Sequence, residues 1–281
     1  MSEQIYTMIA QAKALHEACQ LEDAANLYKQ TLELASSTGE IPEELLDSYA
    51  ELSNTTGDAA TAISLFQESI NRYPTQNPSK YFSLAQLNSG KQSLTLYRAG
   101  IEILKQNLSE ENSRIQLATA YSAIAELHMS DLCDEENAEE ICESSIQAAI
   151  EYDPNCIDAY QMLANLRLVR LRFQEAKEAM EKVKLLLEKA KHDSLPSIEF
   201  ILESMRNLIE IEDFDGVLWV GDIGLSMDED MPEIIYMQAF AHCKLGRKKE
   251  SGDLIEILSG KMLDPELFSA LEELKQELRK L

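Results

Sequence analysis

The sequence has few of the residues and motifs from which catalytic sites are built. Its 281 residues include four histidines, which are separated from one another by dozens of residues. It has no glycine-rich phosphate loop, no His-Glu-x-x-His motif and no Gly-x-Ser-x-Gly motif. Paired carboxylates are abundant, but they lie in charge runs that water reaches, whereas a general acid needs a desolvated carboxyl group. These absences predict a protein that is not an enzyme and needs no cofactor.

Cysteines are also few and scattered. The five of them form an odd-numbered set without a Cys-x-x-Cys pair, so neither a disulfide framework nor a zinc finger is expected. His128, Cys133 and Cys142 are three candidate metal ligands, but a fourth is lacking and their spacing matches no zinc motif. We therefore expect a helix-packing histidine and reduced thiols, and no metal.

Long apolar runs are missing as well. No segment approaches the roughly eighteen uninterrupted apolar residues of a membrane span. The N-terminal residues MSEQIYTMIAQAK lack the charged-then-apolar order of a signal peptide. These features predict a soluble intracellular protein without a membrane partner.

Basic residues are outnumbered by acidic ones. Twenty-five Lys and Arg against fifty Asp and Glu leave a formal net charge of −25. A surface of this sign repels nucleic acid and anionic lipid, and it attracts basic proteins. No direct nucleic-acid partner is therefore expected, although acidity can also serve solubility alone.

What the sequence does contain is a recurring helical pattern. At helical spacing, Tyr160, Leu163 and Ala164 share one face of a first helix. Ala176 and Met180 share one face of the helix that follows. A large residue followed by Leu-Ala, and then Ala-x-x-x-large in a second helix, is the 34-residue tetratricopeptide pattern. This segment is therefore expected to form a helical hairpin.

The pattern recurs along the whole chain. We predict one domain over residues 1–281, an all-α, right-handed tetratricopeptide superhelix (α-solenoid) of about seven helical hairpins. The approximate units are 5–38, 43–76, 78–107, 113–156, 157–190, 195–228 and 232–260, followed by a capping helix over 264–281.

Two units depart from the regular length in opposite directions. In the third, the second helix arrives about four residues early, which compresses the turn at residues 88–91. The fourth contains about five extra residues between its helices, at 131–137. This insertion is expected to project at one edge of the stack. Its acidic members are Asp131, Asp134, Glu135 and Glu136.

The first helices of the hairpins are expected to line an inner groove. The positions that fall between the packing residues are Glu44, Asp47, Glu51, Phe82, Gln86, Ser122, Glu126, Asp158, Gln161 and Asn165. This acidic and amide-rich set predicts a site for an extended basic peptide, with Phe82 stacking on an Arg or aromatic side chain. Tetratricopeptide co-chaperones that clamp acidic tails carry Lys and Arg at such positions, so that class is disfavoured.

Several segments between Lys80 and Arg247 resemble one family more than they resemble generic repeats. They are SLAQLNSGKQSLTLYRAGIEIL from residue 83, the stretch from Ala123 to Met180 that holds the acidic insertion, LIEIEDFDGVLWVGDIGL from residue 208 and IIYMQAFAHCKLGR from residue 234. Together they are similar to the dedicated assembly chaperones of large-subunit ribosomal protein four.

This resemblance implies a non-enzymatic chaperone in the cytoplasm and the nucleus. Such a protein would bind the long basic loop of the newly made ribosomal protein, prevent its aggregation and deliver it for ribosome assembly. A monomer is expected. Two alternatives stay open, a tetratricopeptide scaffold that joins the subunits of a complex and an accessory subunit of an enzyme.

Overall fold

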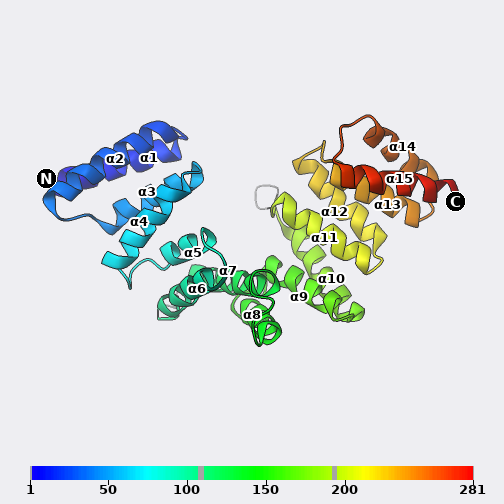
Figure 1. Ribbon diagram of the computed structural model, residues 1–281, viewed down its shortest axis with the longest axis horizontal. Helices are drawn as coiled ribbons and strands as arrows, with labels where there is room; N and C mark the ends of the chain where they lie inside the picture. Colours follow the sequence, from blue (N-terminus) through cyan, green and yellow to red (C-terminus); the bar gives the residue numbers. More distant parts are fainter. Residues whose placement is uncertain (1, 107–110, 192–194, 281) are drawn as a thin grey trace. The chain divides into compact units, whose positions relative to one another are not determined.

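The computed structural model describes residues 2–106, 111–191 and 195–280, and within these ranges it consists of fifteen α-helices without a strand (Figure 1). The helices are α1 (Ser2–Glu17), α2 (Leu21–Thr38), α3 (Glu43–Thr55), α4 (Ala59–Arg72), α5 (Ser79–Gln86), α6 (Gly90–Lys105), α7 (Glu111–Met129), α8 (Ala138–Tyr152), α9 (Ile157–Val169), α10 (Phe173–Lys189), α11 (Ile198–Glu210), α12 (Phe214–Met227), α13 (Pro232–Lys244), α14 (Lys248–Ser259) and α15 (Pro265–Lys280).

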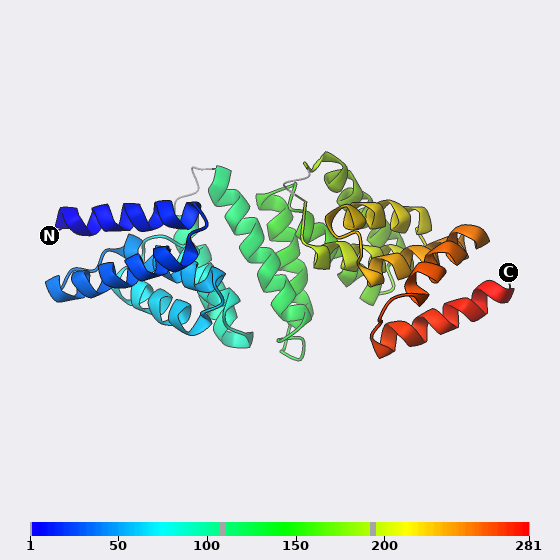
Figure 2. The same cartoon turned by 90° about the horizontal axis from the view of Figure 1, so that it is seen from above.

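Each odd-numbered helix up to α13 packs against the even-numbered helix that follows it, and α15 packs on α13 and α14. Figure 2 shows the first of these pairs, α1 and α2, side by side. The predicted all-α fold of tetratricopeptide-type hairpins with a final helix is therefore confirmed. The number of repeats and the single-domain organisation stay predictions.

The small residues of the tetratricopeptide pattern are buried within the hairpins. Ala62 on α4 and Ala164 on α9 are both fully buried, as is Ala176 on α10. The large residues one turn further on, Phe66 and Met180, are also fully buried. An alanine lets two helix backbones approach, and the larger side chain then fills the space beside the crossing.

The chain divides into two compact units, Met1–Tyr152 and Asp153–Leu281. Buried residues of α1 to α4, together with Leu84 of α5, form one core of the first unit, and buried residues of α5 to α7 form another. In the second unit, one core spans α9 to α13 and a smaller one joins α13 and α14 to α15. Each unit is described by itself below.

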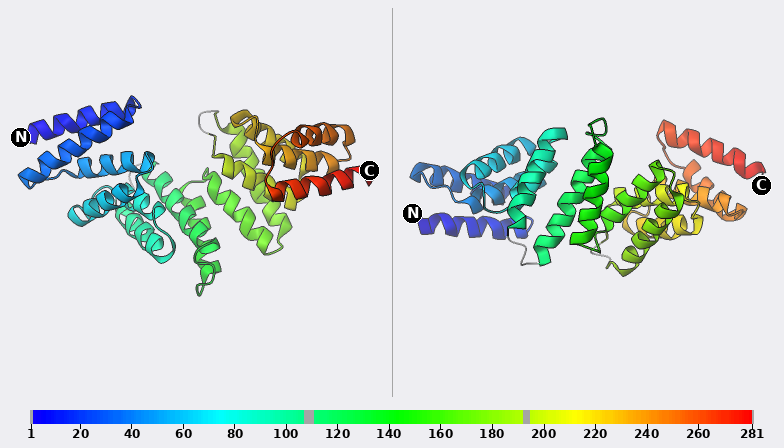
Figure 3. Two further views of the ribbon diagram at one scale, coloured as in Figure 1. Left: turned by 45° about the horizontal axis from the view of Figure 1, so that its top comes forward. Right: turned by 90° about the horizontal axis from the view of Figure 1, so that it is seen from below.

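The loop of the long fourth hairpin packs against the short third hairpin. Figure 3 shows the loop that joins α7 to α8 extending beyond both helices. One carboxylate oxygen of Asp131 in this loop accepts a hydrogen bond from Gly90 N at the start of α6, at 2.8 Å. Glu135 pairs with Lys91 at 2.8 Å, and Leu132 is only 5% exposed. The extra residues of one hairpin therefore contact the turn of its neighbour. That turn, residues 87–89, is as long as the turn 56–58 between α3 and α4. The expectation of a compressed turn is corrected, because the third hairpin is short in its first helix, α5, which has only 8 residues.

The acidic insertion was expected to project, and it also packs against the neighbouring hairpin. Asp131 supplies an acceptor to a backbone N–H at a helix start, where the helix dipole favours negative charge. Glu135 neutralises an adjacent lysine. Asp134 and Glu136 are exposed, as expected of a projecting loop. Part of the insertion thus serves the fold.

Candidate acidic binding surface

The predicted groove residues differ widely in their exposure. Glu44, Glu51, Gln86, Glu126 and Asp158 are exposed, Phe82 and Asn165 are half-buried, and Asp47, Ser122 and Gln161 are buried. Only the exposed members can meet a partner without a rearrangement. Half of the predicted set therefore remains as a candidate surface.

Asp47 is the clearest correction. It is 5% exposed, and its two carboxylate oxygens accept hydrogen bonds from the Ser69 hydroxyl and from the Asn77 side-chain amide. Beside it the buried Lys80 ammonium donates to Ser69 Oγ at 3.3 Å and pairs with Glu43 at 2.6 Å. Asp47 thus belongs to a buried polar network that joins α3, α4 and α5, because a buried charge is tolerated only with such partners.

Two further members hold the helices together instead of facing a partner. The Gln161 side-chain amide donates to Phe200 O and to Ser204 Oγ, both at 2.7 Å, and so ties α9 to α11. Ser122 is 3% exposed. Their burial corrects the expectation that they line an open groove. Polar residues between packing positions were mistaken for surface residues.

Asn165 lies at the edge of the same contact between α9 and α11. Its side-chain amide donates to Glu203 Oε1 at 3.2 Å. The residue is half-buried, so it stays a candidate that a partner could reach after this hydrogen bond opens.

Phe82 is used within its own hairpin. Its ring stacks on Tyr97 with centroids 6.1 Å apart, and a Cβ built on Gly100 would lie 2.5 Å from the Phe82 ring. Glycine at position 100 therefore makes room for the ring. One face of the Phe82 ring is therefore covered within the protein, and its stacking on a partner stays a prediction.

Of the predicted groove residues in the first unit, three are exposed carboxylates, and they differ in whether they already form an ion pair. Glu44 pairs with Lys13 of α1. Burial, and then the neighbouring Asp47, raises the pKa of Glu51, although Lys13 and His16 oppose this rise. Within the described ranges neither Glu51 nor Glu126 has a side-chain ion pair or hydrogen bond. These two carboxylates are available to a cationic partner.

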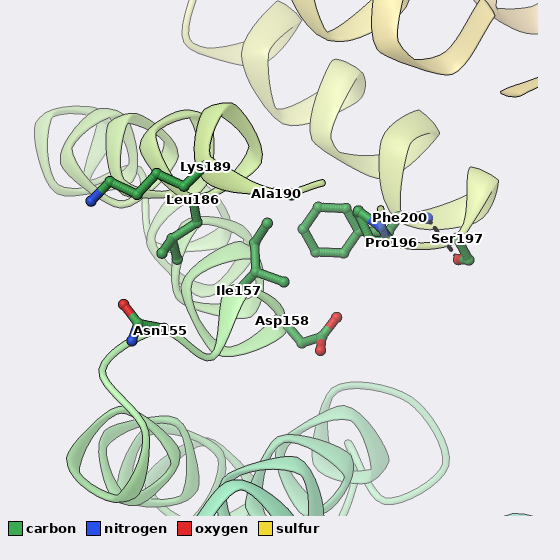
Figure 4. Close-up of a pocket in the computed structure, with 9 residues that line it drawn as sticks. All are labelled: Asn155, Ile157, Asp158, Leu186, Lys189, Ala190, Pro196, Ser197 and Phe200. Atoms are coloured by element: carbon green, nitrogen blue, oxygen red, sulfur yellow. Dashed lines mark hydrogen bonds between the residues drawn. The ribbon is translucent and has the colours of Figure 1, made fainter. Parts of the chain in front are cut away.

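The second unit places Asp158 at a hollow of about 700 Å³ (Figure 4). Its walls are apolar and its rim is polar; they are formed by Asn155, Ile157, Asp158, Leu186, Lys189, Ala190, Pro196, Ser197 and Phe200. Desolvation by burial raises the pKa of Asp158, although a hydrogen bond from its own backbone N–H opposes this rise. Asp158 is therefore a carboxylate that is exposed enough to be reached and incompletely hydrated.

The hollow lies where three helix ends of the second unit meet. α9 and α11 begin beside it and α10 ends there. Ser197 caps α11 by accepting a hydrogen bond from Phe200 N at 3.3 Å, which fixes the first turn that carries the Phe200 side chain. In Figure 4 Ile157 points toward the Phe200 ring, whereas the Lys189 amine lies well away from the Asp158 carboxylate.

This arrangement suits a long side chain with an apolar stem and a positive tip. The methylene groups of Lys or Arg can pack on Ile157, Leu186 and Phe200 while the charged end meets Asp158. Sequence reasoning identified Asp158 but missed the walls, because Leu186 and Phe200 come from other helices.

The described residues include no group of three or more His, Cys, Asp or Glu side chains that could hold a metal ion. His128 is 4% exposed and its Nδ1 lies 2.8 Å from Ile124 O within α7, while Cys142 is buried. Within the same ranges, every helix is too short or too polar to traverse a lipid bilayer.

Comparison with known proteins gives two relatives with the same description. No family model matches the chain. A Schizosaccharomyces pombe protein named probable assembly chaperone of rpl4 is 36% identical over 182 residues, which cover 60% of this chain and 53% of that protein. An Emericella nidulans protein of the same name is 25% identical over 193 residues, covering 65% and 49%. The chain thus spans about half the length of these curated relatives.

Solved structures agree on the fold. Residues 1–338 of the assembly chaperone of RpL4 (Acl4) align with a TM-score of 0.77 at 23% identity, covering 89% of this chain and 99% of that one. A tetratricopeptide repeat protein from Parabacteroides merdae aligns with a TM-score of 0.55 at 10% identity, covering 99% of both chains. The resemblance inferred from the sequence is therefore confirmed: the chain has a tetratricopeptide-type fold and is similar in sequence to assembly chaperones of rpl4.

Proposed function

We propose that the chain is a dedicated chaperone of a newly made, basic ribosomal protein, the large-subunit protein four (rpl4). The similarity to the Schizosaccharomyces pombe chaperone, at 36% identity, is the observation that carries this proposal. In this role the protein binds its client, prevents the client's aggregation and delivers it for ribosome assembly. It catalyses no reaction and acts as a monomer in the cytoplasm and the nucleus.

The charge of the chain supports a basic client. With a net charge of −25, it attracts cationic segments at long range, and close carboxylates then select the ones that fit. Glu51 and Glu126 in the first unit, and Asp158 in the second, are the candidates for these close contacts. A basic protein that would otherwise attach to stray polyanions is shielded while these carboxylates neutralise it.

Client capture in cells tests the proposal. The tagged chain and rpl4 are co-expressed, and the soluble rpl4 that co-purifies with the tag is quantified. We expect most soluble rpl4 to co-purify. If instead rpl4 stays insoluble and the tagged chain co-purifies with a stable multi-subunit complex, the protein is a scaffold and not a chaperone of rpl4.

A double variant that reverses two charges tests whether the candidate carboxylates bind the client. Glu126→Lys with Asp158→Lys should lower capture by about tenfold or more, since each change replaces an attraction by a repulsion. The control is Glu33→Lys with Glu229→Lys, which changes the net charge equally by using one exposed carboxylate of each unit. Equal losses in the two pairs would mean that total charge matters and that Glu126 and Asp158 are not the site.

A further inference from the structure

A second hollow, of about 400 Å³, lies between α10 and α12 in the second unit, and no predicted groove residue belongs to it. It is lined by Glu181, Lys184, Leu185, Glu188, Asp213, Asp215, Gly216 and Trp219. Trp219, the single tryptophan of the chain, is 37% exposed there, and Leu185 is 41% exposed. Apolar area that stays in contact with water does not stabilise the isolated chain. The exposed parts of Trp219 and Leu185 therefore contribute no burial energy.

Among the described residues, the charged side chains that line the hollow are paired except for Glu188. Lys184 bonds to Asp213 Oδ2 at 2.7 Å and to Glu181 Oε1 at 2.8 Å. Arg247 pairs with Asp215 at 2.8 Å. Within the part of the chain that the structure describes, the Glu188 carboxylate has no ion pair or side-chain hydrogen bond, so the hollow has a surplus of negative charge beside an exposed indole ring.

The local fold holds this arrangement in place. Asp213 caps α12 by accepting a hydrogen bond from Gly216 N at 3.0 Å while it also binds Lys184. A Cβ on residue 216 would lie 2.5 Å from the Asp213 carboxylate, so only glycine permits both contacts. Lys184 therefore stays paired with Asp213 and Glu181 and does not neutralise Glu188.

We propose that this hollow binds an arginine side chain of the basic client, with its guanidinium stacked on Trp219 and paired with Glu188. Arginine fits better than lysine because its planar guanidinium stacks on an aromatic face and bonds a carboxylate at the same time. A nucleic-acid base could also stack on the indole, but its phosphates would meet the surplus of carboxylates. This inference rests on the proposed function for the identity of the partner, and it adds a contact on the second helices of the hairpins.

The fluorescence of Trp219 reports on the hollow without a label. The purified chain is titrated with an arginine-rich peptide and with the same peptide carrying lysine in place of each arginine. We expect a saturable change in emission with the arginine peptide, and a response several-fold weaker with the lysine peptide. Equal responses, or no change in emission, would overturn the proposed stacking.

Variants test the site by calorimetry with the same peptide and with rpl4. Trp219→Leu and Glu188→Gln should each weaken binding of the arginine peptide by about three- to tenfold, the range expected for a cation–π contact or a partly exposed charge pair. Glu210→Gln, at an exposed position of the same unit, is the matched control. Trp219→Leu binding as tightly as the wild type would contradict the inference.

The two proposals fail separately. If rpl4 is captured normally but neither Trp219→Leu nor Glu188→Gln weakens its affinity, the hollow is not a client contact and the proposed function stands. If rpl4 is not captured while the arginine peptide still binds at Trp219, the hollow serves another basic partner and the proposed function fails.

Discussion

Two aspartates that were both predicted to bind a partner lie in different environments, one in a buried polar network and the other at an apolar hollow. Asp47, in the corner formed by α3, α4 and α5, has hydrogen-bond donors on both carboxylate oxygens. Asp158, at the meeting of α9, α10 and α11, faces mainly apolar side chains, and desolvation raises its pKa. The neighbouring helices therefore decide whether a first-helix carboxylate stabilises the fold or stays available to a partner.

The comparison also separates two uses of acidity in one chain. Carboxylates such as Asp47 and Asp131 accept hydrogen bonds from the protein itself. Others differ: among the described residues the Glu126 carboxylate has no such partner, and the Asp158 carboxylate accepts only from its own backbone N–H. Net charge does not distinguish the two groups, and only the second can serve a basic client.

Removing Asp47 from the buried polar network should have the largest effect on stability. Asp47→Ala removes the acceptor of Ser69 and Asn77, while the buried Lys80 keeps its bonds to Glu43, Ser69 and Tyr73 O. We expect a loss of about 3 kcal/mol in the free energy of unfolding, because two hydrogen bonds to a charged group are lost, each worth about 1.5 kcal/mol or more. Denaturant unfolding followed by circular dichroism measures it, with the exposed Glu33→Ala as control. A loss below about 1 kcal/mol would show that the network is not needed.

Neutralising the other aspartate should change binding and not folding. Asp158→Asn keeps the shape of the hollow and removes its charge, so affinity for rpl4 should fall by about three- to tenfold, as for a single partly exposed charge pair. Unfolding should be unaffected or slightly harder, because an incompletely hydrated carboxylate is removed. Calorimetry and denaturant unfolding on the same preparation check both. Unchanged affinity would remove Asp158 from the candidate surface.

The acidic insertion contains both kinds of carboxylate in one loop, and we expect effects on stability of intermediate size there. Asp131→Ala removes the hydrogen bond to Gly90 N and should cost about 1 kcal/mol of stability. Asp134→Ala, at an exposed position of the same loop, should cost almost nothing. Equal effects in denaturant unfolding would contradict the assignment of Asp131 to the fold.

The smallest expected effect is a dependence on pH. Because the pKa of Asp158 is higher in the folded protein than in the unfolded chain, the folded state holds this proton more tightly. The wild type should therefore gain stability relative to Asp158→Asn as pH falls through the folded pKa toward the unfolded value, and the gain should be complete below the latter. Thermal unfolding of both proteins across this range measures the difference. A relative loss on acidification would reverse the assigned cause.

The affinity of the site should change with pH in the opposite sense. As pH falls through the folded pKa of Asp158, the carboxylate is neutralised and the wild type should bind a basic peptide more weakly. Asp158→Asn lacks this group, so its affinity should change less over the same range.

Helical spacing was enough to predict the hairpins, because the buried positions of each helix repeat within its own sequence. It also predicted the short third and long fourth hairpins, but not that Asp131 of one bonds to Gly90 of the other, since the contact joins residues far apart in the chain. Asp47 could not be told from Asp158 for the same reason. Their surroundings come from Ser69 and Asn77 in one case and from Leu186 and Phe200 in the other.

The most direct test of the account is a titration of the purified chain with the basic internal loop of rpl4 at low and at high salt. Binding through unpaired carboxylates predicts tight association at low salt, a steep loss of affinity as salt rises, and a shallower dependence for Glu126→Lys with Asp158→Lys. Failure to bind at low salt, or an affinity that salt does not change, would contradict it.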